Sequence, residues 1–156
     1  MRAFFFATMA ALFASTAQAD TLTARDGWRI LPTQLSYKDL VTRLNDAVKA
    51  NKMLLVTRAS ATAGAKAQGI TIPGNMIVGV YRNDFARRML DISVSAGIEA
   101  PIRYYITENT DSTATLSYKT PTAVFAPYFD EGGDALKDLA SELDTLFAKM
   151  ADEAVQ

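Results

Sequence analysis

Residues 102–119, IRYYITENTDSTATLSYK, decide the fold of this chain. Within 102–106 and again within 114–118, apolar or aromatic residues at every second position alternate with more polar ones. A period of two is typical of a half-buried strand, and residues 109–112 have the composition of a turn. The stretch therefore predicts two antiparallel strands joined in a hairpin.

Hydrophobic period and capping residues predict the other elements. Ser36 has the character of an N-cap, with Asp39 three residues later, and apolar residues follow at helical spacing over 37–50. Asn83 or Asp84 is expected to cap the start of a second helix, and Gly97 is expected to end it. The remaining expected elements are a strand at 27–32 closed by Pro32, a strand at 53–57, a short helix at 61–68 and a strand at 76–81.

These elements predict an α+β protein: a single compact domain over residues 20–129, with a largely antiparallel sheet flanked by helices. An amphipathic helix is added at the C-terminus, over residues 130–156, where leucines recur three and four residues apart. This segment contains eight acidic residues and two lysines, a net charge of −6. Its leucine stripe either packs on its own domain or forms an interface with a second copy or a partner protein, and the short stripe favours the first.

Residues 1–19 have the pattern of a secretory signal peptide. A positive start is followed by an uncharged run from Ala3 to Ala14 and then by small residues up to Ala19. A bilayer-spanning helix needs about 20 apolar residues, so a transmembrane anchor is disfavoured. We expect cleavage between Ala19 and Asp20 and an exported mature chain, periplasmic or secreted, without stable membrane insertion.

Composition excludes several classes of chemistry. The 156 residues include no cysteine and no histidine, which removes disulfides, thiol catalysis, zinc fingers and Ser-His-Asp triads. Lysine and arginine number 16 against 17 acidic residues, so the chain lacks the basic footprint of a nucleic-acid-binding protein. No residue pattern predicts a metal site, a cofactor or a catalytic residue.

With the elements placed, the chain resembles the family known as domain of unknown function 302, over about residues 28–128. The resemblance rests on LSYKDLVTRLNDAV in the first helix, on ATAGAKAQGITI, and on IEAPIRYYITENTDSTATLSYKTP. The last string is similar to the family's strand, acidic turn and second strand, which ends in a Tyr-x-x-Pro phrase at Tyr118–Pro121. The resemblance implies a compact α+β domain, often self-associating, and no settled activity.

The chain also departs from that family at two places. Many members have an Asp-His pair where this chain has Ser60 and Ala61. Many also have a Gly-Asn-Pro phrase after the third strand, followed by Gly-Thr, where this chain has residues 81–83 and 86–87. The resemblance therefore transfers no functional residue to this sequence.

A group of cations and aromatic residues is the candidate ligand site. Arg82 ends a strand at the expected start of a helix, where free backbone N–H groups favour anions, and Arg103 and Tyr105 share one face of their strand. The candidate ligand-binding residues are Arg82, Asn83, Arg87, Arg103 and Tyr105. A structural interpretation competes, because Asp84–Arg88 and Arg87–Asp91 are spaced for ion pairs along one helix.

The sequence supports three hypotheses about function. The first is an exported, non-catalytic module that binds a small anionic ligand or a protein partner. The alternative is an enzyme that acts on a small anionic substrate through arginine, tyrosine and carboxylate groups. The third is a structural subunit that assembles as a homodimer, or with a partner protein, through its C-terminal helix.

Overall fold

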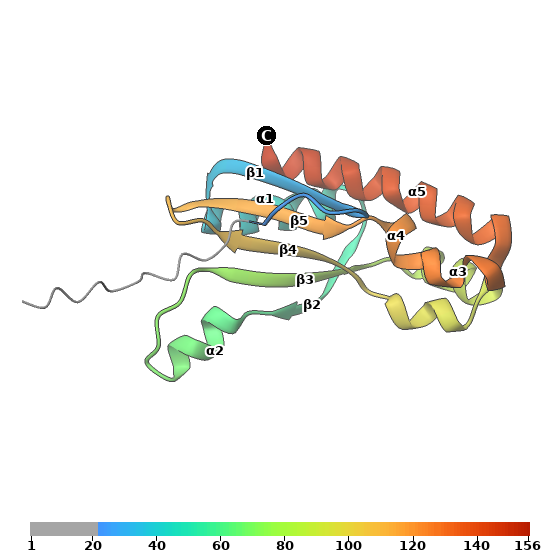
Figure 1. The fold of residues 1–156 in the computed structure, drawn as a ribbon, viewed down its shortest axis with the longest axis horizontal. Helices are drawn as coiled ribbons and strands as arrows, with labels where there is room; N and C mark the ends of the chain where they lie inside the picture. The colour runs from blue at the N-terminus through green and yellow to red at the C-terminus, as the bar shows by residue number, and fades with distance from the viewer. Residues whose placement is uncertain (1–21) are drawn as a thin grey trace, which may run out of the picture.

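The computed structural model describes residues 22–156, so the expected signal peptide and its cleavage site between Ala19 and Asp20 lie outside the described residues. The described chain forms a five-stranded sheet in which every neighbouring pair is antiparallel, in the order β1-β5-β4-β3-β2 (Figure 1). The strands are β1 (Trp28–Ser36), β2 (Leu54–Ala59), β3 (Asn75–Tyr81), β4 (Ile102–Glu108) and β5 (Thr113–Lys119). The helices are α1 (Tyr37–Ala50), α2 (Ala61–Ala67), α3 (Asn83–Ile92), α4 (Pro121–Phe125) and α5 (Phe129–Val155), with short 3₁₀ turns η1 (Ser95–Glu99) and η2 (Ala126–Tyr128).

The predicted single α+β domain with an antiparallel sheet and a C-terminal helix is therefore confirmed. The β4–β5 hairpin lies where its alternation predicts it, with Tyr104 opposite Tyr118. The helix that begins after Ser36 is also confirmed, because the Ser36 hydroxyl accepts the Asp39 N–H at 3.2 Å and donates to its carboxylate at 2.7 Å. Within the described chain no helix is long and apolar enough to cross a membrane.

The core lies between one face of the sheet and the two long helices. Helix α1 contributes Leu40, Leu44 and Val48 to this core, and all three are fully buried. The sheet contributes Tyr104 and Tyr118, whose rings meet the ring of Phe147 from α5 with centroids 5.0 and 5.9 Å apart. The Tyr104 hydroxyl donates a hydrogen bond of 2.8 Å to the Phe147 carbonyl oxygen, and burial raises the pKa of this phenol well above its usual value.

The apolar stripe of α5 is part of this core. Its buried side chains are Leu136, Leu139, Leu143, Phe147 and Met150. The helix begins at Phe129, and Gly133, with φ of 56°, bends its first turn. Because the stripe packs against its own sheet and α1, the outward surface of α5 is its acidic side. Figure 1 shows α5 running along the sheet.

Three element boundaries differ from the predictions. Strand β1 runs through Pro32 to Ser36, because an edge strand has ladder hydrogen bonds on one side alone and tolerates proline. The strand expected at 53–57 is instead β2, Leu54–Ala59, which has a register irregularity between Leu55 and Thr57.

The third difference concerns α3. Arg82 occupies the N-cap position and makes no side-chain capping bond, so neither Asn83 nor Asp84 caps this helix. The helix ends at Ile92 rather than near Gly97, because Ser93 turns to extended backbone and its hydroxyl accepts the N–H of Ala96, which starts η1.

Gly79 of β3 allows a close approach that positions the segment before β4. A Cβ atom at residue 79 would overlap the Thr57 hydroxyl oxygen and would lie 2.8 Å from the Pro101 Cγ. Pro101 and Thr57 therefore pack where a side chain would otherwise stand. By contrast, a Cβ atom at Gly64 of α2 would meet nothing within 4 Å.

Replacing Phe147 with alanine should lower the free energy of unfolding by about 3–5 kcal/mol, because it removes a buried ring that contacts both core tyrosines. Urea denaturation followed by circular dichroism measures the change. Thr145→Ala, at an exposed position of the same helix, is the control and should stay within about 0.5 kcal/mol of the parent. A loss below about 1 kcal/mol for Phe147→Ala would contradict the central place of this ring.

The two glycines provide a matched pair. Gly79→Ala should lower the free energy of unfolding by about 1–3 kcal/mol, because the new methyl group must displace Pro101 or Thr57. Gly64→Ala should leave it unchanged or raise it by up to about 1 kcal/mol, since alanine favours helix. Thermal unfolding of both variants checks the pair, and equal losses would show that space at residue 79 is unimportant.

Candidate functional site

The face of the sheet opposite α1 and α5 presents charged and aromatic side chains. Alternate residues of each strand point to this face, and the strand register brings them into rows. In the first row Trp28 lies opposite Lys119, and Arg103 lies opposite Gly79. Since Tyr104 pairs with Tyr118, Arg103 and Lys119 are neighbours on adjacent strands. Two cations therefore stand side by side next to the tryptophan.

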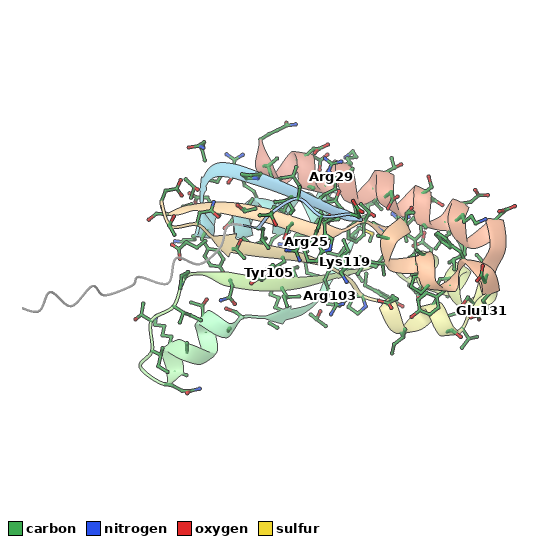
Figure 2. The ribbon with its side chains drawn as sticks, viewed as in Figure 1. Arg25, Arg29, Arg103, Tyr105, Lys119 and Glu131 are labelled. Atoms are coloured by element: carbon green, nitrogen blue, oxygen red, sulfur yellow. The ribbon has the colours of Figure 1, made fainter. Side chains whose placement is uncertain are left out.

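The second row is mostly apolar. It consists of Ile30, Ser117, Tyr105 and Ile77, which face one another across β1, β5, β4 and β3. Ser117 is fully buried among its neighbours, whereas Ile77 is 39% exposed. Figure 2 shows Arg25, Arg103, Tyr105 and Lys119 gathered over the middle of the sheet. The sheet face thus changes from cationic to apolar between two adjacent rows.

A cavity of about 600 Å³ lies over these rows, a size within the range of small-molecule sites. Parts of η1, α4 and the start of α2 also contribute to its walls. Its lining residues are Trp28, Ala59, Ser60, Ala61, Asn75, Ile77, Glu99, Ile102, Arg103, Tyr104, Tyr105, Tyr118, Lys119 and Val124. Ser60 and Ala61, where the sequence departs from the Asp-His pair of its relatives, are among them.

The charge of the cavity wall is positive. Arg103 and Lys119 are exposed, and neither forms an ion pair with another residue of the described chain. The acid of the lining is Glu99, which accepts a hydrogen bond of 2.9 Å from the Tyr128 hydroxyl. That bond raises the pKa of Tyr128 above its usual value. The wall therefore contains two cations that have no counter-ion among residues 22–156.

Trp28 lies at the cationic end of the cavity. The Lys119 Nζ is 5.8 Å from its ring centroid and the Arg25 Cζ is 5.2 Å away, both within cation–π range. These contacts favour one position for the lysine stem and leave its ammonium group accessible to an anion. Trp28 is the one tryptophan of the sequence, so its fluorescence reports on this end of the cavity.

The structure brings together two of the five candidate residues. Arg103 and Tyr105 line the cavity, whereas Arg82, Asn83 and Arg87 at the start of α3 are absent from its lining. The Arg82 guanidinium contacts both carboxylate oxygens of Asp84, at 2.7 and 3.0 Å, and lowers the pKa of that carboxyl. The Arg82 Cζ also lies 4.4 Å from the Phe85 ring centroid. The Arg82 side chain is therefore already engaged by two neighbouring residues, Asp84 and Phe85.

The ion pairs expected along α3 also differ. Asp84 pairs with Arg82 rather than with Arg88. Arg88 instead reaches Glu142 of α5 at 2.7 Å and joins the two helices. Within residues 22–156, Arg87 and Asp91 form no ion pair. Tertiary contacts thus replace the local pairs that spacing alone indicates.

Sequence reasoning missed Lys119, Trp28 and Ile77 as site residues. Lys119 could have been found, because the alternation of its strand places it on the same hairpin face as Arg103. Trp28 and Ile77 come from other strands, and their approach depends on the β1–β5 and β3–β4 pairings. No local pattern indicates those pairings.

Comparisons with known proteins agree on one family. The family described as "Domain of unknown function DUF302" matches residues 30–154. A crystal structure of an uncharacterized conserved DUF302 protein from Bacillus stearothermophilus is similar, with a TM-score of 0.73 and 18% sequence identity. The match covers 83% of this chain and 99% of that one, and shows a shared fold. No curated protein matches the sequence.

Proposed function

The chain belongs to the DUF302 family, and from that premise we propose that it is an exported, non-catalytic module that binds a small anionic ligand. The binding site is the cavity over the open face of the sheet. Export rests on the signal-peptide pattern of residues 1–19. The family's description leaves the activity open, so the argument for binding comes from the cavity itself.

One observation carries the proposal: Arg103 and Lys119 stand side by side in the wall of a 600 Å³ cavity without an ion-pair partner in the described chain. An arginine fork binds a carboxylate or phosphate through two parallel hydrogen bonds, and a neighbouring ammonium adds a second charge. Such charge-assisted bonds are stronger than neutral ones. An anion between these two groups would complete the site.

The lining favours binding over catalysis. Acid–base catalysis by carboxylates needs an acid and a base near the same reacting group. Glu99 is the one carboxylate among the lining residues, and Tyr128 holds it by a hydrogen bond. The remaining lining residues supply cations, amides, hydroxyls and apolar groups, which bind and orient a ligand.

A protein partner on α5 has weaker support. The apolar side of this helix is buried in the chain's own core, so a partner would meet its acidic side. Several acidic groups there already have partners: Arg88 pairs with Glu142, Lys137 with Asp134 and Lys149 with Glu153. That α5 forms a homodimer or a complex with a partner protein is a prediction from the sequence alone.

Replacing Arg103 with alanine should weaken the binding of benzoate roughly tenfold, because it removes one charge-assisted contact worth about 1.5 kcal/mol. Titration of Trp28 fluorescence, with calorimetry as an independent measurement, gives the dissociation constants. Arg43→Ala is the matched control, since Arg43 is exposed on α1, which packs on the opposite face of the sheet. It removes the same charge and should leave the affinity unchanged. Equal affinities of the parent and Arg103→Ala would contradict the proposed site.

A further inference from the structure

We infer that the ligand of this cavity is an anionic amphiphile, specifically a medium-chain carboxylate, whose head lies at Arg103 and Lys119 and whose hydrocarbon lies over Tyr105 and Ile77. The inference rests on the proposed function and adds the class and the orientation of the ligand. It follows from the difference between the two rows of the open sheet face.

The cationic row and the apolar row are adjacent. Arg103 and Tyr105 are two residues apart on β4, a separation of about 7 Å along a strand. Gly79 and Ile77 stand in the same relation on β3 and pair with them. A ligand that contacts both rows therefore has a charged end and, within about 7 Å, an apolar body.

The far end of the cavity has apolar surface without a protein cover. Ile77 is 39% exposed although it is a large aliphatic residue on a sheet. Ala59 pairs with Ile77 from β2, and Ala61 follows at the start of α2. Tyr105, which pairs with Ile77 from β4, also lines the cavity. Covering these groups with hydrocarbon removes apolar area from water, which is favourable.

The polar side chains at that end are already engaged. The Asn75 side-chain oxygen accepts the Ala61 N–H at 2.9 Å, and its amide nitrogen donates to the Pro73 carbonyl oxygen at 3.3 Å. The Ser60 hydroxyl accepts the Ala63 N–H at 3.2 Å. The bond from Ala61 to Asn75 ties α2 to β3, and the Ser60 bond caps α2. Both side-chain oxygens are therefore less available to a hydrophilic ligand body.

Charge and size argue for a carboxylate with a hydrocarbon chain rather than a bare anion. Two cations that have no ion-pair partner in the part of the chain that the structure describes select a negative head, and the cavity of about 600 Å³ extends well beyond them over the apolar row. Small-molecule sites of this size bury most of a ligand's surface. Inorganic phosphate would occupy the cationic end alone and leave Ile77 exposed.

The test is a titration of Trp28 fluorescence with acetate, butyrate, hexanoate and octanoate at constant ionic strength. Octanoate should bind at least tenfold more tightly than butyrate, because its longer hydrocarbon chain would cover the apolar row and leave water. Ile77→Ser should reduce this ratio severalfold, because it should weaken the binding of octanoate more than that of butyrate. Ile70→Ser is the control, since Ile70 is 53% exposed and is not a lining residue.

The outcomes separate the two proposals. Affinity that rises with chain length and depends on Ile77 supports the amphiphile. Affinity that depends on Arg103 but not on chain length overturns the amphiphile and leaves the anion site intact. No binding of any of the four carboxylates, by fluorescence or by calorimetry, overturns both. Binding to phosphatidylglycerol vesicles without binding to octanoate overturns the free amphiphile in favour of a lipid surface.

Discussion

The hydrogen bond from the Tyr104 hydroxyl to the Phe147 carbonyl oxygen, inside a cluster of three aromatic rings, fixes the layout of this protein. It attaches the long C-terminal helix α5 to the central strand β4, and α1 packs beside α5 on the same side. One face of the sheet is therefore covered. Within residues 22–156 no long helix covers the opposite face, and the side chains that alternate with the core residues form the wall of a cavity there.

This asymmetry explains why consecutive residues of one strand lie in different environments. Tyr104 points into the core and is fully buried, whereas Arg103 and Tyr105 point to the open face. The same holds on β5, where Tyr118 packs on Phe147 and Lys119 reaches Trp28. In this chain without cysteine, one side of the sheet packs into the core and the other side forms the wall of the cavity.

The sequence predicted what depends on local pattern. The hairpin, the helix after Ser36 and the shared face of Arg103 and Tyr105 follow from periods of two and of 3.6 residues. Strand pairing between distant segments is not encoded locally, so the place of Trp28 beside Lys119 required the structure. Arg82 was expected to bind an anion at a helix start, but Asp84 two residues later already holds its guanidinium.

The central claim is that the open sheet face, rather than the start of α3, binds an anion. The most direct measurement is a two-dimensional ¹H–¹⁵N NMR titration of the isotope-labelled protein with octanoate. The account predicts shift changes at Trp28, including its indole N–H, and along β4 and β5 around Arg103 and Lys119, with α1 and α5 unaffected. Shift changes confined to residues 82–87, or absent altogether, would contradict it.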